Sequence, residues 1–171
     1  MLFRSDELVS ALFIRYRADL LGLLASAPEV ENVRQAGLFL RQLCGCIWAH
    51  RFIYRDLNDL LTRNRQLETE MKEVLEHKNT AFQVLLNQLC KADFLTMDAG
   101  ERQLTARHMV LQSTWWLSYA YVLQPRGALE EDNGPVAIAD ATHALMGLCQ
   151  PYAAVPARPQ FQAAVSALAL S

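Results

Sequence analysis

The sequence has few charged residues beyond its first hundred positions, and it lacks any apolar run long enough to cross a membrane. Its formal net charge is −2, so no basic field is available to attract nucleic acid. Arg15, Arg17 and Asp19 interrupt the first apolar stretch, which therefore lacks the layout of a signal peptide. We expect a soluble, cytoplasmic protein that does not engage membranes.

Cysteines are too few for a disulfide framework in a chain of 171 residues; they are Cys44, Cys46, Cys90 and Cys149. The first two are two positions apart in a predicted helix, so their side chains point in different directions. Free cysteines that behave as small apolar residues fit a reducing compartment.

Motifs for catalysis are missing as well. No glycine-rich phosphate loop and no nucleophile motif is present. The four histidines are scattered, and no group of histidine, cysteine and carboxylate residues has metal-ligand spacing. His77 follows Glu73 by four positions, which suits a surface pair on a helix. We therefore predict no enzymatic activity, no metal and no cofactor.

Helical periodicity dominates what is present, and strand signals are nearly absent. Ser5 suits the N-cap of the first helix, in which Leu8, Leu12, Tyr16, Leu20 and Leu24 share one stripe. Asp56 is placed to cap a short helix, and Arg51 and Arg55 are expected to be exposed or paired with Asp56 or Asp59. The pattern predicts an all-α fold of about seven helices in one domain over residues 1–171. The predicted helices cover residues 6–25, 32–50, 57–63, 64–91, 101–123, 135–149 and 160–170, with a bend at 51–56.

Charge is unevenly distributed along the chain. Of 34 charged residues, only seven lie between Gln103 and Ser171. Depletion of charge is typical of the centre of a subunit interface, although burial within a monomer gives the same pattern. We favour an interface in this part of the chain.

Three segments in order carry a resemblance to a known family: Phe3–Leu8, Phe52–Leu57 and Trp115–Tyr119. The first resembles the stretch that follows the DNA-recognition helix in TetR-type transcriptional regulators. The second resembles the Phe-(Phe/Tyr)-Tyr-Arg-Asp-Leu segment of one branch of their C-terminal domains, and the third resembles the tryptophan-containing helix that comes next. The order and spacing of helices agree from Phe3 to about Tyr152.

The resemblance implies an all-helical effector domain that forms a homodimer through a four-helix bundle. The bundle helices would be those at residues 101–123 and 135–149, the second of which is rich in small residues that permit close approach. The predicted interface positions are Trp116, Ala137, Ala141, Ala144 and Leu145.

A small apolar or aromatic effector is expected between the helices, in a pocket lined by aromatic side chains with a few polar groups. For each candidate, packing in the core is the alternative, because cores use aromatic residues heavily. The candidate ligand-binding residues are Tyr16, Trp48, Phe52, Tyr54, Met109, Trp115, Trp116 and Tyr119.

The function implied is that of a transcriptional regulator, acting as a repressor. Nothing before Phe3 has the length of a helix-turn-helix, so residues 1–5 read as the remnant of a junction to a DNA-binding head that is missing or upstream. Residues 1–171 are expected to contact DNA only through such a head. The alternative is a helical dimer without a head that serves as a small-molecule or protein-binding module.

Overall fold

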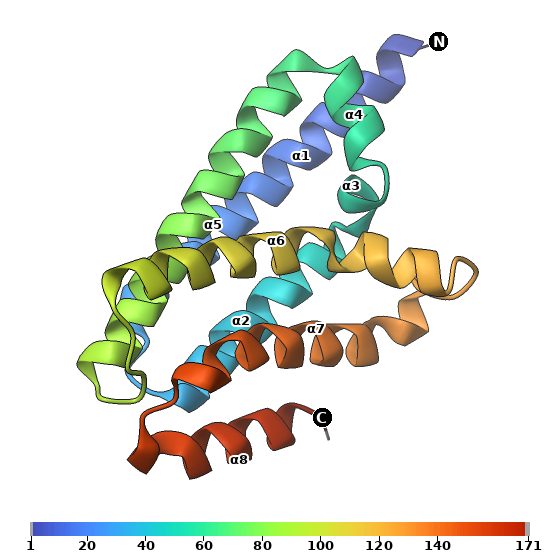
Figure 1. The fold of residues 1–171 in the computed structure, drawn as a ribbon. Coiled ribbons are helices and arrows are strands. Elements are labelled where there is room, and N and C mark those ends of the chain that lie inside the picture. The colour runs from blue at the N-terminus through green and yellow to red at the C-terminus, as the bar shows by residue number, and fades with distance from the viewer. Residues whose placement is uncertain (1, 170–171) are drawn as a thin grey trace.

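The computed structural model describes the backbone of residues 2–169 and the side chains of residues 7–167. Within that range the chain is all-α, as predicted, and its only extended pairing is an isolated bridge between Leu95 and Ala153. None of the described helices is long and apolar enough to span a bilayer. The helices are α1 (Leu2–Leu24), α2 (Val33–Ala49), α3 (Arg51–Arg55), α4 (Leu57–Arg63), α5 (Arg65–Lys91), α6 (Ala99–Leu123), α7 (Gly134–Cys149) and α8 (Arg158–Ala169) (Figure 1).

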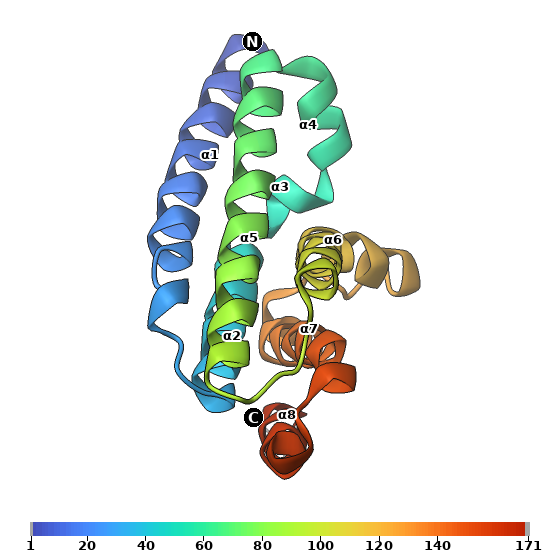
Figure 2. The same ribbon diagram turned by 60° about the vertical axis from the view of Figure 1, so that its left-hand side comes forward.

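The helices form two layers. Helices α1 and α5 run side by side in the same direction, and α2 returns along α1 (Figures 1 and 2). Helices α6 and α7 form an antiparallel pair that crosses this layer, with α6 against α5 and α7 against α2. Helix α8 packs on α7 and α2. Viewed from the side, α6 and α7 are seen nearly end-on next to the first layer (Figure 2).

The long helices α5 and α6 each begin after a residue that caps the helix with its side chain. Asn64 accepts a hydrogen bond from the amide of Leu67 at the start of α5, as predicted. At the start of α6, Asp98 and Glu101 form a reciprocal capping box, which satisfies two amides that the helix itself leaves free. These caps define where α5 and α6 begin, and the two helices pack against each other.

Three local predictions are wrong. The bend at residues 51–56 contains a short helix, α3, which makes eight helices in the described range instead of about seven. Asp56 makes no side-chain cap, because its carboxylate pairs with the Arg55 guanidinium. Helix α1 begins at Leu2, so Ser5 lies within the helix rather than at its N-cap, and its side chain lies outside the described range.

The predicted stripe on α1 is buried only in its second part. Tyr16, Leu20 and Leu24 lie in the core, whereas Leu8 is 60% exposed. The reason is that the N-terminal part of α1 lies above the level at which α6 and α7 cross the first layer (Figure 1). Phe13 lies in the core beside the stripe.

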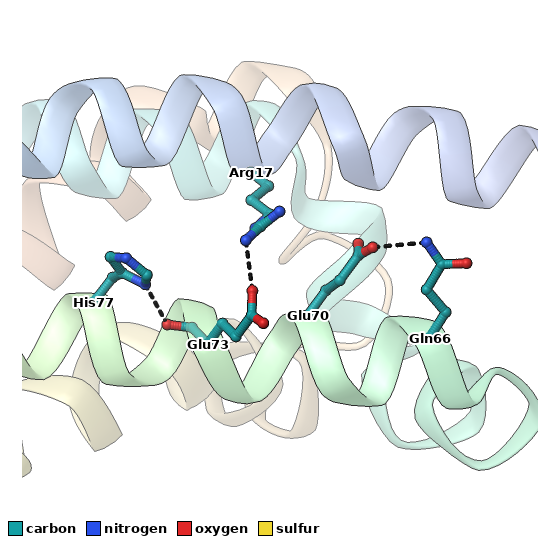
Figure 3. A network of polar contacts seen from close by, with 5 residues as sticks. All are labelled: Arg17, Gln66, Glu70, Glu73 and His77. Atoms are coloured by element: carbon teal, nitrogen blue, oxygen red, sulfur yellow. Dashed lines mark hydrogen bonds and ion pairs between the residues drawn. The ribbon is translucent and has the colours of Figure 1, made fainter.

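Helices α1 and α5 are also linked by a polar seam on their outer side (Figure 3). Arg17 of α1 pairs with the carboxylate of Glu73 on α5, and Gln66 donates to Glu70 one turn away. The predicted pair of His77 and Glu73 exists only as a contact of the imidazole with the Glu73 backbone carbonyl. The Arg17–Glu73 pair is partly exposed and therefore contributes little to stability, about 0–1 kcal/mol.

The first residue of α7, Gly134, lies directly against the indole of Trp48 on α2. A Cβ at position 134 would lie 2.6 Å from Trp48 Nε1. The indole is held on its other sides, because it stacks on Trp116 with ring centroids 6.2 Å apart and lies 5.0 Å from the Arg51 guanidinium carbon. The close approach of α7 to α2 therefore requires glycine at this position.

We expect Gly134→Ala to lower the free energy of unfolding by roughly 1–3 kcal/mol, because the added methyl group overpacks a fixed aromatic cluster. Gly147→Ala in the same helix is the matched control, since a Cβ there meets nothing within 4 Å. The control is expected to gain roughly 0.5–1 kcal/mol from helix propensity. Urea unfolding of both variants measures the difference, and equal stabilities would contradict the packing described.

Candidate functional site

The predicted aromatic residues fall into two interior groups. Tyr16 and Tyr54 are fully buried and share a hydrogen bond between their hydroxyl groups. Trp48 and Trp116 are each 7% exposed and form the stacked pair described above. Met109 is fully buried, and Phe52 is half-buried at the edge of the core.

Trp115 and Tyr119 do not join these groups. They are 39% and 68% exposed and lie on the outer face of α6. Neither side chain is interior: Trp115 lies opposite the buried side that Met109 and Leu117 occupy, whereas Tyr119 lines a groove between α6 and α7 together with Trp116.

The centre of the domain holds a fully buried lysine, Lys78 of α5, which the sequence reasoning missed. Its Nζ donates to Tyr54 Oη at 3.3 Å and to Thr114 Oγ1 at 3.2 Å. Thr114 belongs to α6, Tyr54 to α3, and Tyr16 extends the chain of hydroxyl groups to α1. We call these four residues the Lys78 cluster.

Burial lowers the pKa of Lys78 to about 7, because an ammonium group loses its hydration in the core. The negative charge that Cys44 and Cys46 of α2 can carry acts against this lowering of the pKa. Burial also raises the pKa of both tyrosines, so their hydroxyl groups stay protonated. The cluster is thus a set of neutral hydroxyl groups around an amine that changes its charge near neutral pH.

Lys78 had a sequence signal that was passed over. It lies among polar residues in the first half of α5, yet it follows Met71 and Val74 at helical spacing and precedes Phe82 on the same inward stripe. A charged residue at a core position of an amphipathic helix is the pattern that identifies it.

A groove of about 420 Å³ lies between α5 and α6, and none of the four cluster residues lines it. Leu75 and Asn79 line it from α5, close in sequence to Lys78, and Val110 lines it from α6, one turn before Thr114. Leu104 contributes a further apolar wall, and Arg107 and Glu76 supply charged groups of opposite sign.

A second groove, of about 410 Å³, lies between α6 and α7 on the opposite side of α6. Of the predicted interface residues, Ala137 and Ala144 line it and are half-buried. Trp116 and Ala141 form part of its lining but are nearly covered, at 7% and 4% exposed. Leu145 is fully buried within the monomer, so it belongs to the core.

Other polar residues of the core region have local partners. Arg51 donates to the backbone carbonyls of Leu129 and Trp48 instead of pairing with an acid, and His50 contacts Asp19 at 3.1 Å. In the described part of the chain no three histidine, cysteine or acidic side chains are grouped as a metal ion would require. The Trp116 indole N–H is buried and has no acceptor among the described residues.

The charge state of Lys78 predicts a pH dependence of stability. Between its folded pKa of about 7 and its ordinary value of about 10.4, the unfolded chain holds a proton that the folded chain has released. The unfolded state thus binds more protons, so stability rises with pH through this window, by up to about 1.4 kcal/mol per pH unit.

We expect Lys78→Met to be more stable than the wild type at pH 6.5, with the difference narrowing by roughly 2 kcal/mol by pH 8.5, a range that lies below most thiol and phenol titration. The substitution strands no acceptor, because Tyr54 keeps Tyr16 and Thr114 Oγ1 donates to the Val110 carbonyl. Lys72→Met, at an exposed site on the same helix, is the control and should follow the wild type. Denaturant unfolding across this pH range measures the curves, and parallel curves for wild type and Lys78→Met would contradict the assignment.

Comparison with known proteins places this geometry in a family. A family model described as TetR, bacterial transcriptional repressor, matches residues 15–161. A TetR-family transcriptional regulator from Marinobacter aquaeolei VT8 has the same fold, with a TM-score of 0.78 and 16% sequence identity over 95% of this chain and 76% of that chain. A comparison with curated proteins gives no match. Since the family model covers most of the sequence, from α1 into α8, the chain belongs to the TetR family of bacterial transcriptional regulators.

Proposed function

We propose that residues 1–171 are the effector-binding and dimerisation domain of a transcriptional repressor. The observation that carries the proposal, beyond family membership, is that α6 is apolar on two opposite faces. Its inner face includes Met109, Val110 and Leu117 in the core. Its outer face exposes large apolar side chains, which are Leu104, Leu111, Trp115, Tyr119, Val122 and Leu123.

The outer face supports pairing with a second copy of the chain. A helix that is apolar all round is stable only where both faces are covered. The groove between α6 and α7 adjoins this face, and Asp140 is the one charged residue in its lining.

The inner face supports coupling between effector and dimer. Thr114 of the Lys78 cluster and Trp115 of the outer face are adjacent residues on one rigid helix. An effector that favours one arrangement of α6 against α5 would therefore also bias the arrangement of two subunits. Tyr16 extends the cluster to α1, whose N-terminal end lies beside α4 at the far end of the molecule from α8 (Figure 1).

In this proposal the domain binds and does not catalyse, and DNA is contacted through a helix-turn-helix outside residues 1–171. The second candidate function is a helical dimer that binds a small molecule or protein without any role at DNA. The outer face of α6 and the Lys78 cluster serve that function equally well, so association with DNA in cells separates the two.

Substitution of Val122 by Glu is expected to abolish dimer formation. Val122 is 78% exposed on the outer face, so the folded monomer tolerates the charge while a covered interface does not. Val155→Glu is the matched control, at a residue 69% exposed outside α6 and α7. Light scattering at micromolar concentration should give about twice the 19.3 kDa chain mass for wild type and control, and the chain mass for Val122→Glu. A monomeric wild type, or a dimeric Val122→Glu, would place the interface elsewhere or remove it.

The regulatory role has its own test in the cells that produce the protein. Crosslinking and immunoprecipitation of the native polypeptide should enrich a small number of promoter sequences, whereas purified residues 1–171 should give no sequence-selective shift of those duplexes. Uniform background in the immunoprecipitate would instead favour the binding module. A selective shift at nanomolar concentration by residues 1–171 alone would show that the DNA-reading element lies within them.

A further inference from the structure

The Lys78 cluster holds more hydrogen-bond donors than acceptors. The ammonium group and the hydroxyl groups of Tyr16 and Tyr54 together carry five hydrogens. Three of them are bonded, one to Tyr54 Oη, one to Thr114 Oγ1 and one between the two tyrosines. Whichever tyrosine donates to the other, the cluster keeps one N–H and one O–H without an acceptor among the described residues.

The cluster also holds a positive charge without a counterion. Among the described residues no carboxylate forms an ion pair with Lys78, and Glu73 on the same helix pairs with Arg17 instead. The groups that bond the amine are the hydroxyl groups of Tyr54 on α3 and Thr114 on α6; Tyr16 of α1 bonds Tyr54 in turn, and Cys44 and Cys46 of α2 are the other titratable groups whose charge acts on the amine. A buried charge of this kind is costly, and a ligand of opposite charge removes the cost.

The groove between α5 and α6 lies next to the cluster in the sequence of both helices, but none of the four cluster residues lines it, so a ligand reaches Lys78 only if the side chains between them move aside. The groove of about 420 Å³ lies on the same contact between these helices that the Lys78–Thr114 hydrogen bond crosses. Leu75, Leu104 and Val110 give it apolar walls. Arg107 adds a cation to its lining, and Glu76 adds an anion that disfavours a second acidic group on a ligand.

From these observations, and resting on the proposed function, we propose that the effector is a monocarboxylic acid with an apolar body. Its carboxylate replaces the Thr114 hydroxyl as a partner of Lys78 and accepts from the unbonded N–H and O–H hydrogens, and its body occupies the groove between α5 and α6. Thr114 loses nothing, because its hydroxyl already donates to the Val110 carbonyl at 2.7 Å.

Charge and hydrogen bonding favour a carboxylate over other acceptors. A carboxylate accepts through both oxygens and donates nothing, which matches a cluster that has only donors to spare. Its single negative charge equals the single positive charge of Lys78, whereas a phosphate dianion would leave a second charge buried. A neutral carbonyl group satisfies the donors but leaves the ammonium group without a counterion.

The test compares acids with their primary amides on the wild-type chain of 171 residues. The probes are octanoate, decanoate, benzoate and phenylacetate at submicellar concentration, at pH 7, each with the amide of the same carbon skeleton. We expect at least one acid to raise the melting temperature while its amide has little effect, with a dissociation constant about ten- to a hundredfold lower for the acid. A panel in which no acid binds more tightly than its amide overturns the proposal.

Variants locate the binding. Lys78→Met should abolish the preference for the acid, and Tyr54→Phe should weaken it, whereas Lys72→Met should bind as the wild type does. An acid that binds Lys78→Met as tightly as wild type would show that the carboxylate lies elsewhere and would overturn the assignment.

A measurement on the wild-type chain alone tests the proposal even if the variants fail to fold. Because the bound carboxylate favours the charged amine, binding at pH 8 should take up close to one proton per acid bound. Calorimetry in two buffers of different ionisation enthalpy measures this number, and the absence of proton uptake counts against Lys78 as the partner.

These experiments need neither DNA nor a regulatory readout. A chain that binds acids at Lys78 but enriches no promoter would retain this inference and lose the repressor function. A chain that dimerises and regulates promoters, but shows no preference for acids, would retain the repressor function and lose this inference.

Discussion

The burial of the Lys78 ammonium group at the meeting point of four helices is the constraint on which the arrangement of the domain depends. Its hydrogen bonds reach Tyr54 on α3 and Thr114 on α6, and Tyr16 brings in α1. Apolar packing holds these helices together, but packing alone tolerates many small shifts. A buried donor requires its acceptors in place, so the cluster fixes the register of the helices and makes that register sensitive to any ligand that offers better acceptors.

In the proposed dimer, helix α6 is the element that links the Lys78 cluster to the subunit interface. The helix is apolar on both faces, with the inner one in the core and the outer one exposed. Thr114 and Trp115 follow one another in the sequence yet belong to opposite faces. On the outer side of α1 and α5, Arg17 pairs with Glu73 (Figure 3). In the proposed function, a change at the amine therefore acts on the outer face through α6.

The fold class and most helix bounds could be predicted from the sequence, because helical periodicity, prolines and capping residues such as Asn64 determine structure within a few neighbouring residues. Sequence reasoning placed Trp115 and Tyr119 in an interior pocket because aromatic content does not show which side of α6 each residue occupies. It missed α3, which is too short to carry a periodic signal. Lys78 was missed because a lysine suggests a surface position, although its place on the inward stripe of α5 indicates burial. Burial of a lysine also depends on hydrogen-bond partners from helices that are distant in the sequence.

The charge of Lys78 is accessible to direct measurement, because the chain contains only three lysines, Lys72, Lys78 and Lys91. In protein labelled with ¹³C at the lysine ε-carbon, Lys78→Met identifies one of three signals in an NMR pH titration. The account predicts that this signal titrates near pH 7, while the other two titrate near the ordinary pKa of about 10.4. Three signals that all titrate near that ordinary value would show that the amine is hydrated, and would contradict the buried cluster on which both the coupling and the effector chemistry rest.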